Sequence, residues 1–257
     1  MGMAAGAAIV GNRPIVEVLF VDFACLAMDQ VINQAAKYRF MSGGQGVVPM
    51  VLRTQGGAGN SLAAQHSQSL EALFYHIPGL KLVMPSTPYD AKGLLKSSIR
   101  DSDPVVFIEH KLLYMTEGEV PEGEYLIPLG KADVKREGSD VTLLTYSYMT
   151  LKCLEAAERL GVEAEVIDLR SLVPLDKECI LASVKKTGKL VIVHEACKRG
   201  GIGGDLAAMV VEEAFFDLDR PPVRVAGKNT PIPFSLNLEK LCVPSADDIV
   251  EAVRSLG

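Results

Sequence analysis

Histidine is the side chain whose ordinary pKa lies nearest neutral pH, and this 257-residue chain contains only four. One of them, His66, ends a segment rich in glycine and alanine (residues 56–66, GGAGNSLAAQH) between a predicted strand and a predicted helix. Loops at the carboxyl ends of parallel strands are where α/β proteins place reactive groups. An imidazole there could act as an acid, a base or a hydrogen-bond donor. The residues alone leave open whether His66 does chemistry or only bonds a neighbour near the start of the helix.

Other candidate groups have weaker contexts. His76 precedes a turn, while His110 and His194 end predicted strands, so we interpret all three as structural. Residues 200–204 (GGIGG) fit either a phosphate-binding loop or a closely packed turn. The turn is favoured because the ordered G-x-G-x-x-G and a following lysine are absent. Four carboxylates near strand or helix ends could be general bases, and spacing does not choose among Glu17, Asp22, Asp29 and Glu109.

Alternating strand and helix patterns must position these groups. Apolar runs predict strands, the first of them buried, at 15–20, 49–53, 80–84, 104–109, 141–145, 165–168, 190–194 and 223–226. Helices are predicted at 1–11, 28–40, 69–76, 88–100, 150–160, 176–187, 203–216 and 246–256. Thr87 is expected to cap the helix that starts at Pro88. This order predicts an α/β protein of two domains with parallel sheets flanked by helices.

The domain boundary is predicted from a change in amino-acid composition. Residues 116–138 are rich in glycine, glutamate and proline, which favours a connection that contributes an edge strand. We therefore expect a first domain over 1–117, a connection over 118–138 and a second domain over 139–257.

Composition excludes several classes of protein. The net charge of −6 argues against nucleic acid as a partner, because binding phosphates needs a surplus of lysine and arginine. Apolar runs are too short to span a bilayer, and residues 1–11 lack the basic segment of a signal peptide. The five cysteines form no C-x-x-C pair, which disfavours both a disulfide framework and a structural zinc site. These features predict a reduced, cytoplasmic protein.

Several motifs together resemble one enzyme family along essentially the whole chain. They match the β subunit of thiamine-diphosphate-dependent 2-oxoacid dehydrogenases, which include the pyruvate, branched-chain and acetoin enzymes. The matching segments are 27–37 (AMDQVINQAAK), 42–44 (SGG), 63–69 (AAQHSQS), 78–81 (PGLK), 86–95 (STPYDAKGLL), 99–101 (IRD), 127–132 (IPLGKA), 168–170 (DLR) and 183–188 (SVKKTG).

The resemblance implies a transketolase-like fold, with a pyrimidine-binding domain followed by a transketolase C-terminal domain. It implies an oxidoreductase subunit that decarboxylates or cleaves pyruvate, another 2-oxoacid or acetoin and passes the acyl group to lipoyl. Residues 63–66 look more like the pyruvate and acetoin branches. The implied partners are an α subunit in an α2β2 assembly, a second β subunit and the dihydrolipoyl acyltransferase core. The α subunit would share the thiamine diphosphate and hold magnesium through a G-D-G…N-N motif, which this chain lacks.

The resemblance also implies roles for individual residues in binding the cofactor, in catalysis, in binding potassium and in docking a partner. Phe23 falls where the family places an aromatic ring against the cofactor's pyrimidine, and His66 falls on the active-site histidine. Some members bind potassium through carbonyl oxygens, at positions that match Met50, Ser98, Ile99, Asp101 and Asp103. Asn229 lies where some members carry an acidic residue that docks the acyltransferase core.

One departure from the family concerns the glutamate that activates the cofactor. In the family it lies a few residues upstream of a helix resembling residues 2–11, and this sequence starts at Met1. Glu17 does not match that position. The expectation is an N-terminally truncated β subunit, inactive alone and poor at ionising thiamine diphosphate, with apolar surface exposed around 15–20. The alternative is a non-catalytic scaffold subunit of the same complex.

Overall fold

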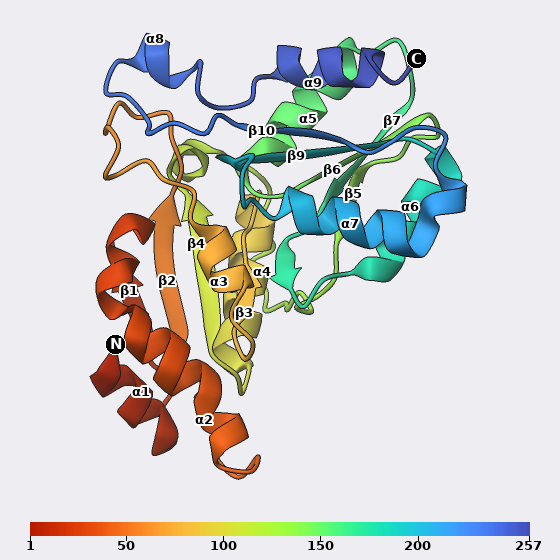
Figure 1. The fold of residues 1–257 in the computed structure, drawn as a ribbon. Coiled ribbons are helices and arrows are strands. Elements are labelled where there is room, and N and C mark those ends of the chain that lie inside the picture. The colour runs from red at the N-terminus through yellow and green to blue at the C-terminus, as the bar shows by residue number, and fades with distance from the viewer.

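The computed structural model describes residues 1–257 and contains two five-stranded sheets (Figure 1). The first sheet has the order β1 (Ile15–Val18), β2 (Val51–Gly56), β4 (Val105–His110), β3 (Lys81–Val83) and β8 (Ser171–Val173). The second has the order β10 (Val223–Gly227), β9 (Leu190–Cys197), β6 (Val141–Thr145), β7 (Ala164–Asp168) and β5 (Asp133–Arg136). All pairings are parallel except those of β8 with β3 and β5 with β7. The predicted α/β class is confirmed.

The helical segments of the first half are α1 (Gly2–Ile9), η1 (Val21–Ala27), η2 (Gln30–Ala35), α2 (Ala36–Met41), α3 (Glu71–Tyr75), α4 (Pro88–Arg100) and η3 (Lys111–Met115). Helix α4 has the predicted bounds, and its cap is present because Thr87 Oγ1 accepts a hydrogen bond from the Asp90 amide at 3.1 Å. The helix predicted over 28–40 is instead built from two types of turn, a π-helix in η2 followed by the α-helix α2.

Two predictions of burial in this half are wrong. Strand β1 was expected to be buried, but its residues alternate between exposed and half-buried because it is an edge strand with one neighbour. Ile15 and Leu19 are 47% and 61% exposed, which agrees with the exposed apolar surface expected around residues 15–20. Helix α1 buries only the face that carries Ala5 and Ala8, while Met3 is almost fully exposed.

The second half contains α5 (Tyr148–Arg159), α6 (Lys177–Thr187), α7 (Gly203–Ala214), η4 (Phe215–Asp217), α8 (Leu236–Glu239) and α9 (Ala246–Arg254). Asp176 caps α6, and Gly188 ends it in the left-handed conformation. A reciprocal pair of bonds between Ser245 and Asp248 caps α9. The predicted edge strand in the connection is β5, whereas β8 and α8 were not predicted.

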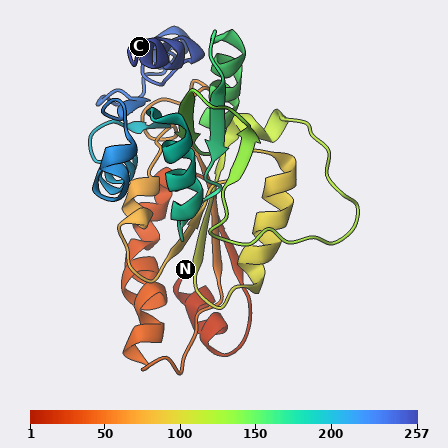
Figure 2. The ribbon, with the colours of Figure 1, turned by 90° about the vertical axis from the view of Figure 1, so that its right-hand side faces the viewer.

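The two halves share one interior. The largest core cluster contains 25 buried residues that run from Val21 to Ala214 and so come from both sheets. Figure 2 shows the segment between η3 and β5 as a long loop that stands away from the sheets on one side of the molecule. No helix has the length and apolar character required to cross a membrane.

Candidate active site

The loop between β2 and α3 carries His66 and has an unusual backbone. Gly57, Gly59, Ser61 and Ala63 all have positive φ angles, +91°, +106°, +53° and +60° respectively. For residues with a Cβ this conformation costs about 1–2 kcal/mol each, so surrounding contacts must hold Ser61 and Ala63 in place. Such local strain is concentrated at functional sites.

Three aromatic rings meet at the end of this loop. The imidazole of His66 lies edge-to-face against Phe20 and Phe23, with ring centroids 5.0 and 5.3 Å away. Phe23 comes from η1 and remains 42% exposed. The structure therefore brings together the two residues that the sequence selected, and one of them presents an accessible ring.

Lys111 supports this cluster from the start of η3, and sequence reasoning missed it. Its ammonium donates a hydrogen bond to the carbonyl oxygen of His66 and lies 5.4 Å from the centroid of the Phe20 ring. Burial lowers the pKa of Lys111 below its ordinary value, although the carboxylates of Asp22, Glu195 and Glu239 oppose the shift. The lysine follows a predicted strand, but nothing in the sequence indicates that it reaches back to residue 66.

Asp22 is the one candidate carboxylate that contacts the His66 loop. Its Oδ1 accepts hydrogen bonds from the Gln68 side chain at 2.8 Å and the Gln68 amide at 3.3 Å, while its Oδ2 is buried without a partner. The other three point elsewhere. Glu17 and Glu109 pair with Arg53 across the first sheet, at 3.1 and 2.7 Å. Asp29 accepts hydrogen bonds from its helical neighbours, Gln30 and Asn33.

His110 joins the two halves of the molecule. Its Nδ1 accepts a hydrogen bond from the Leu112 amide, so its Nε2 carries the hydrogen and donates to Glu195 Oε2 at 2.8 Å. The ring also stacks on Tyr148, with centroids 4.7 Å apart. His110 is 5% exposed, and this setting assigns it a fixed packing and orienting role.

His194 and His76 lie outside the cluster. His194 is fully buried with neither ring nitrogen hydrogen-bonded, and burial lowers its pKa to about 4. A Cβ added to Gly201 or Gly203 would lie 2.5 or 2.6 Å from this ring. The glycine-rich segment at 200–204 thus allows close packing of the turn onto His194. His76 is the exposed C-cap of α3.

The positions matched to potassium ligands already have hydrogen-bond partners at four of their five carbonyls. The carbonyls of Met50 and Ser98 accept from backbone amides. Those of Ile99 and Asp101 accept from Arg13 Nη1, at 2.8 and 2.6 Å. Oxygen donors suit a cation, and at two of the five carbonyls the cationic partner is the Arg13 guanidinium. No group of three or more His, Cys, Asp or Glu side chains could hold a metal ion.

A cavity lies beside the His66 loop. Its volume is about 470 Å³. It is lined by the neighbours of His66 in the loop, residues 64, 65 and 67–70, and by residues 195–197, 199, 227–232, 242 and 243 of the second half. Asn229, at the position matched to a docking residue, lines this cavity and accepts a hydrogen bond from the Arg199 amide at 2.9 Å.

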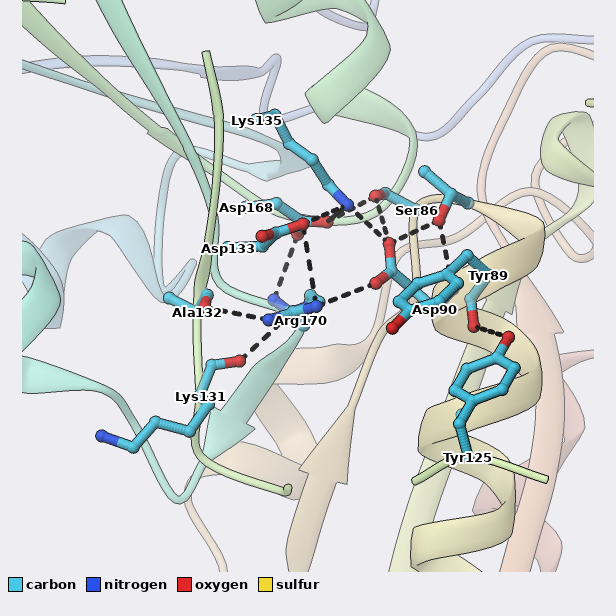
Figure 3. Close-up of polar contacts among 12 residues, drawn as sticks. Ser86, Tyr89, Asp90, Tyr125, Lys131, Ala132, Asp133, Lys135, Asp168 and Arg170 are labelled. Carbon is cyan, nitrogen blue, oxygen red and sulfur yellow. Dashed lines mark hydrogen bonds and ion pairs between the residues drawn. The ribbon is translucent and has the colours of Figure 1, made fainter. Parts of the chain in front are cut away.

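A separate cluster of charged side chains is buried between the sheets (Figure 3). Asp90 of α4 pairs with Lys135 of β5 at 2.7 Å and with Arg170 at 3.0 Å, and Asp168 ends β7 within 3.9 Å of the same lysine. Burial acts to raise the pKa of Asp90, but Lys135, Thr87 and Arg170 outweigh it and lower the pKa. Burial raises the pKa of Asp168 to about 7, because Lys135 and the Ser86 hydroxyl offset the loss of water only in part. Through these pairs the cluster holds α4 against the second sheet.

Comparison with known proteins identifies the family. Residues 1–117 match "Transketolase, pyrimidine binding domain", and residues 130–249 match "Transketolase, C-terminal domain". The β subunit of acetoin:2,6-dichlorophenolindophenol oxidoreductase from Cupriavidus necator is 53% identical over 257 residues, which cover 99% of this chain and 76% of that protein. The chain belongs to the β-subunit family of the acetoin and 2-oxoacid dehydrogenases.

Other members of this family are nearly as similar. The pyruvate dehydrogenase E1 β subunit of Porphyra purpurea is 51% identical over 99% of this chain and 78% of its own length. The 2-oxoisovalerate dehydrogenase β subunit of Bacillus subtilis is 48% identical over 99% and 80%. Among solved structures, "Split gene transketolase, inactive beta4 tetramer" aligns with a TM-score of 0.82 and 27% identity, over 100% of this chain and 79% of that one. The transketolase-like architecture and the family predicted from sequence are therefore confirmed.

Proposed function

We propose that this chain forms one wall of a thiamine diphosphate pocket in a dehydrogenase that acts on pyruvate or acetoin. Residues 1–117 and 139–257 would be its pyrimidine-binding and C-terminal domains, with 118–138 as the connection. The observation that carries the proposal is the pairing of His66 with the accessible Phe23 ring, 5.3 Å apart, in a chain 53% identical to an acetoin oxidoreductase subunit. An α subunit would complete the pocket and hold magnesium, in an α2β2 assembly with a second β subunit.

The residues present fit such a cofactor on this side of the pocket. The exposed face of Phe23 offers an apolar surface on which an aminopyrimidine ring can pack. Thiamine diphosphate, when bound, supplies the carbanion chemistry that protein side chains lack. Potassium binding stays a prediction. Two of the carbonyls matched to potassium ligands, those of Ile99 and Asp101, accept hydrogen bonds from the Arg13 guanidinium.

The role of His66 follows from its surroundings. The edges of Phe20 and Phe23 fix the plane of the imidazole, and Lys111 fixes the backbone at its carbonyl. His66 is half-buried, and the contacts of its imidazole are with the two phenylalanine rings, so its nitrogens are available to a substrate. His66 would donate a hydrogen bond to the substrate carboxylate or carbonyl and move a proton as the acyl group passes to lipoyl on the acyltransferase core.

Reconstitution with an α subunit tests this proposal. With thiamine diphosphate, magnesium and either pyruvate or acetoin, the wild-type pair should reduce dichlorophenolindophenol at a measurable but low rate, in line with the weak ionisation of the cofactor expected from the sequence. The cofactor should raise the melting temperature. His66→Asn should lower turnover about 100-fold or more, as expected for loss of an acid–base group. His76→Asn is the matched control and should have normal turnover.

Two results would contradict the proposal. Full turnover in His66→Asn with both substrates would remove the assigned role of the histidine. Absence of any stabilisation by thiamine diphosphate in the presence of the α subunit would favour the non-catalytic scaffold instead.

A further inference from the structure

A carboxylate from the second half of the chain accepts two hydrogen bonds from the loop that carries His66. Glu239 is the last residue of α8, and its side chain is fully buried. Its Oε1 accepts a hydrogen bond from the Gly59 amide at 2.7 Å, and its Oε2 accepts one from the Ser61 amide at 3.0 Å. Both oxygens of one side chain therefore bind the loop across about 180 residues of sequence.

A second carboxylate holds the flanks of the same loop. Glu195 Oε1 accepts hydrogen bonds from the Ala58 amide at 2.8 Å and the Ser69 hydroxyl at 3.0 Å, and its Oε2 is bound to His110. Burial acts to raise the pKa of Glu195, but His110 and these donors outweigh burial and lower it. Glu195 thus braces the ends of the loop, while Glu239 braces its middle.

The two bonds of Glu239 fall where the backbone most needs support. Gly59 and Ser61 both have positive φ, and Ala63 follows with the same sign. A carboxylate forms shorter and stronger hydrogen bonds with backbone amides than a neutral acceptor does. Without it, the segment 59–63 would be free to relax to conformations that alanine and serine prefer. His66 lies only three residues beyond Ala63, and its amide bonds to the Ala63 carbonyl at 3.3 Å.

We infer that Glu239 is a positioning residue that holds the His66 imidazole in its working place. The inference rests on the proposed role of His66. Helix α8 has only four residues and was not predicted from the sequence. Through Glu239 it would couple the second half of the chain to His66 in the first. Glu239 acts through the loop and does not touch substrate.

The first test measures the loop in the full chain without any assay of activity. Amide hydrogen exchange across residues 57–66 should be at least about 10-fold faster in Glu239→Ala than in wild type, with a smaller effect in Glu239→Gln, which keeps one acceptor oxygen. Exchange in β4 and β6 should not change. Glu251→Ala removes an exposed carboxylate from α9 and is the matched control. Unchanged exchange at 57–66 in both Glu239 variants would overturn the inference.

The second test uses the enzyme reconstituted with its α subunit. Glu239→Ala should lower kcat about 10- to 100-fold, as a small misplacement of a reacting group does, with a lesser change in KM. In the His66→Asn background the same substitution should have little further effect, because both act through one imidazole. An equal loss in both backgrounds would overturn the inference. If His66→Asn alone has full turnover, the proposed function fails, and the exchange experiment still decides whether Glu239 holds the loop.

Discussion

Among single residues, Asp168 should make stability depend on pH. Its carboxyl has a pKa of about 7 in the folded chain and an ordinary value of 3.8, so folding favours the protonated form. That contribution to the free energy of unfolding is complete below pH 3.8 and is lost as pH rises through 7. Asp168→Asn cannot ionise, so its stability relative to wild type should increase from pH 4 to 7, with a limiting slope of about 1.4 kcal/mol per pH unit.

Urea unfolding of both proteins at several pH values measures this difference. Asp133→Asn is the control, because it removes a 38%-exposed carboxylate that pairs with the same Lys135. A constant difference between Asp168→Asn and wild type across this pH range would show that Asp168 is ionised throughout.

The exposed ring of Phe23 should matter for cofactor binding and little for folding. Because its ring is 42% exposed, Phe23→Ala should change the melting temperature of the free chain little. In the presence of an α subunit, however, the affinity for thiamine diphosphate should fall about 10-fold, through loss of an aromatic contact. Calorimetric titration measures this change. Phe216→Ala, which removes a 97%-exposed ring from the second half, should bind as wild type does, and equal affinity in all three proteins would exclude Phe23 from the pocket.

The turn before α7 has no room for added side-chain volume. Gly203→Ala would place a Cβ 2.6 Å from the buried His194 ring and should destabilise the chain by about 1–3 kcal/mol. Substituting His194 by Ala in that background should cost less than it does in the wild type, because the clash is relieved. Gly6→Ala in α1, where nothing lies within 4 Å, should be neutral or stabilising. Denaturant unfolding of Gly203→Ala, His194→Ala, the double variant and Gly6→Ala measures these differences. If inorganic phosphate strongly stabilised the wild-type chain, residues 200–204 would be a phosphate-binding loop and not a packing turn.

Sequence predicted the elements whose signals are local. Helix α4 follows from a cap at Thr87 and a proline at 88, and both act within one turn. Strand β8 and helix α8 have three and four residues and depend on partners far along the chain, so no local period marks them. The same limit applies to the site. His66 and Phe23 were found through motifs, whereas Lys111, Glu195 and Glu239 act through contacts with a distant loop.

For the whole molecule, the shared interior predicts one cooperative unfolding transition. The core cluster that contains Leu172 of β8 draws residues from both sheets, so neither sheet should unfold alone. Leu172→Ala should destabilise the chain by about 2–5 kcal/mol and lower amide protection equally in β4 and β6. Hydrogen exchange detected by mass spectrometry measures both strands at once. Loss of protection in β4 alone would show that the two halves are independent folding units.

The pairing of β8 with β3 also limits how this chain can be recombined. Leu82 and Val173 are partners across that antiparallel ladder, although they lie on opposite sides of the predicted connection. In a chimera whose crossover falls between residues 118 and 138, β3 comes from one parent and β8 from the other, so two strands of different origin would have to pair. Functional hybrids should therefore be enriched for crossovers outside the interval 82–173, or for parents that share the residues of both strands.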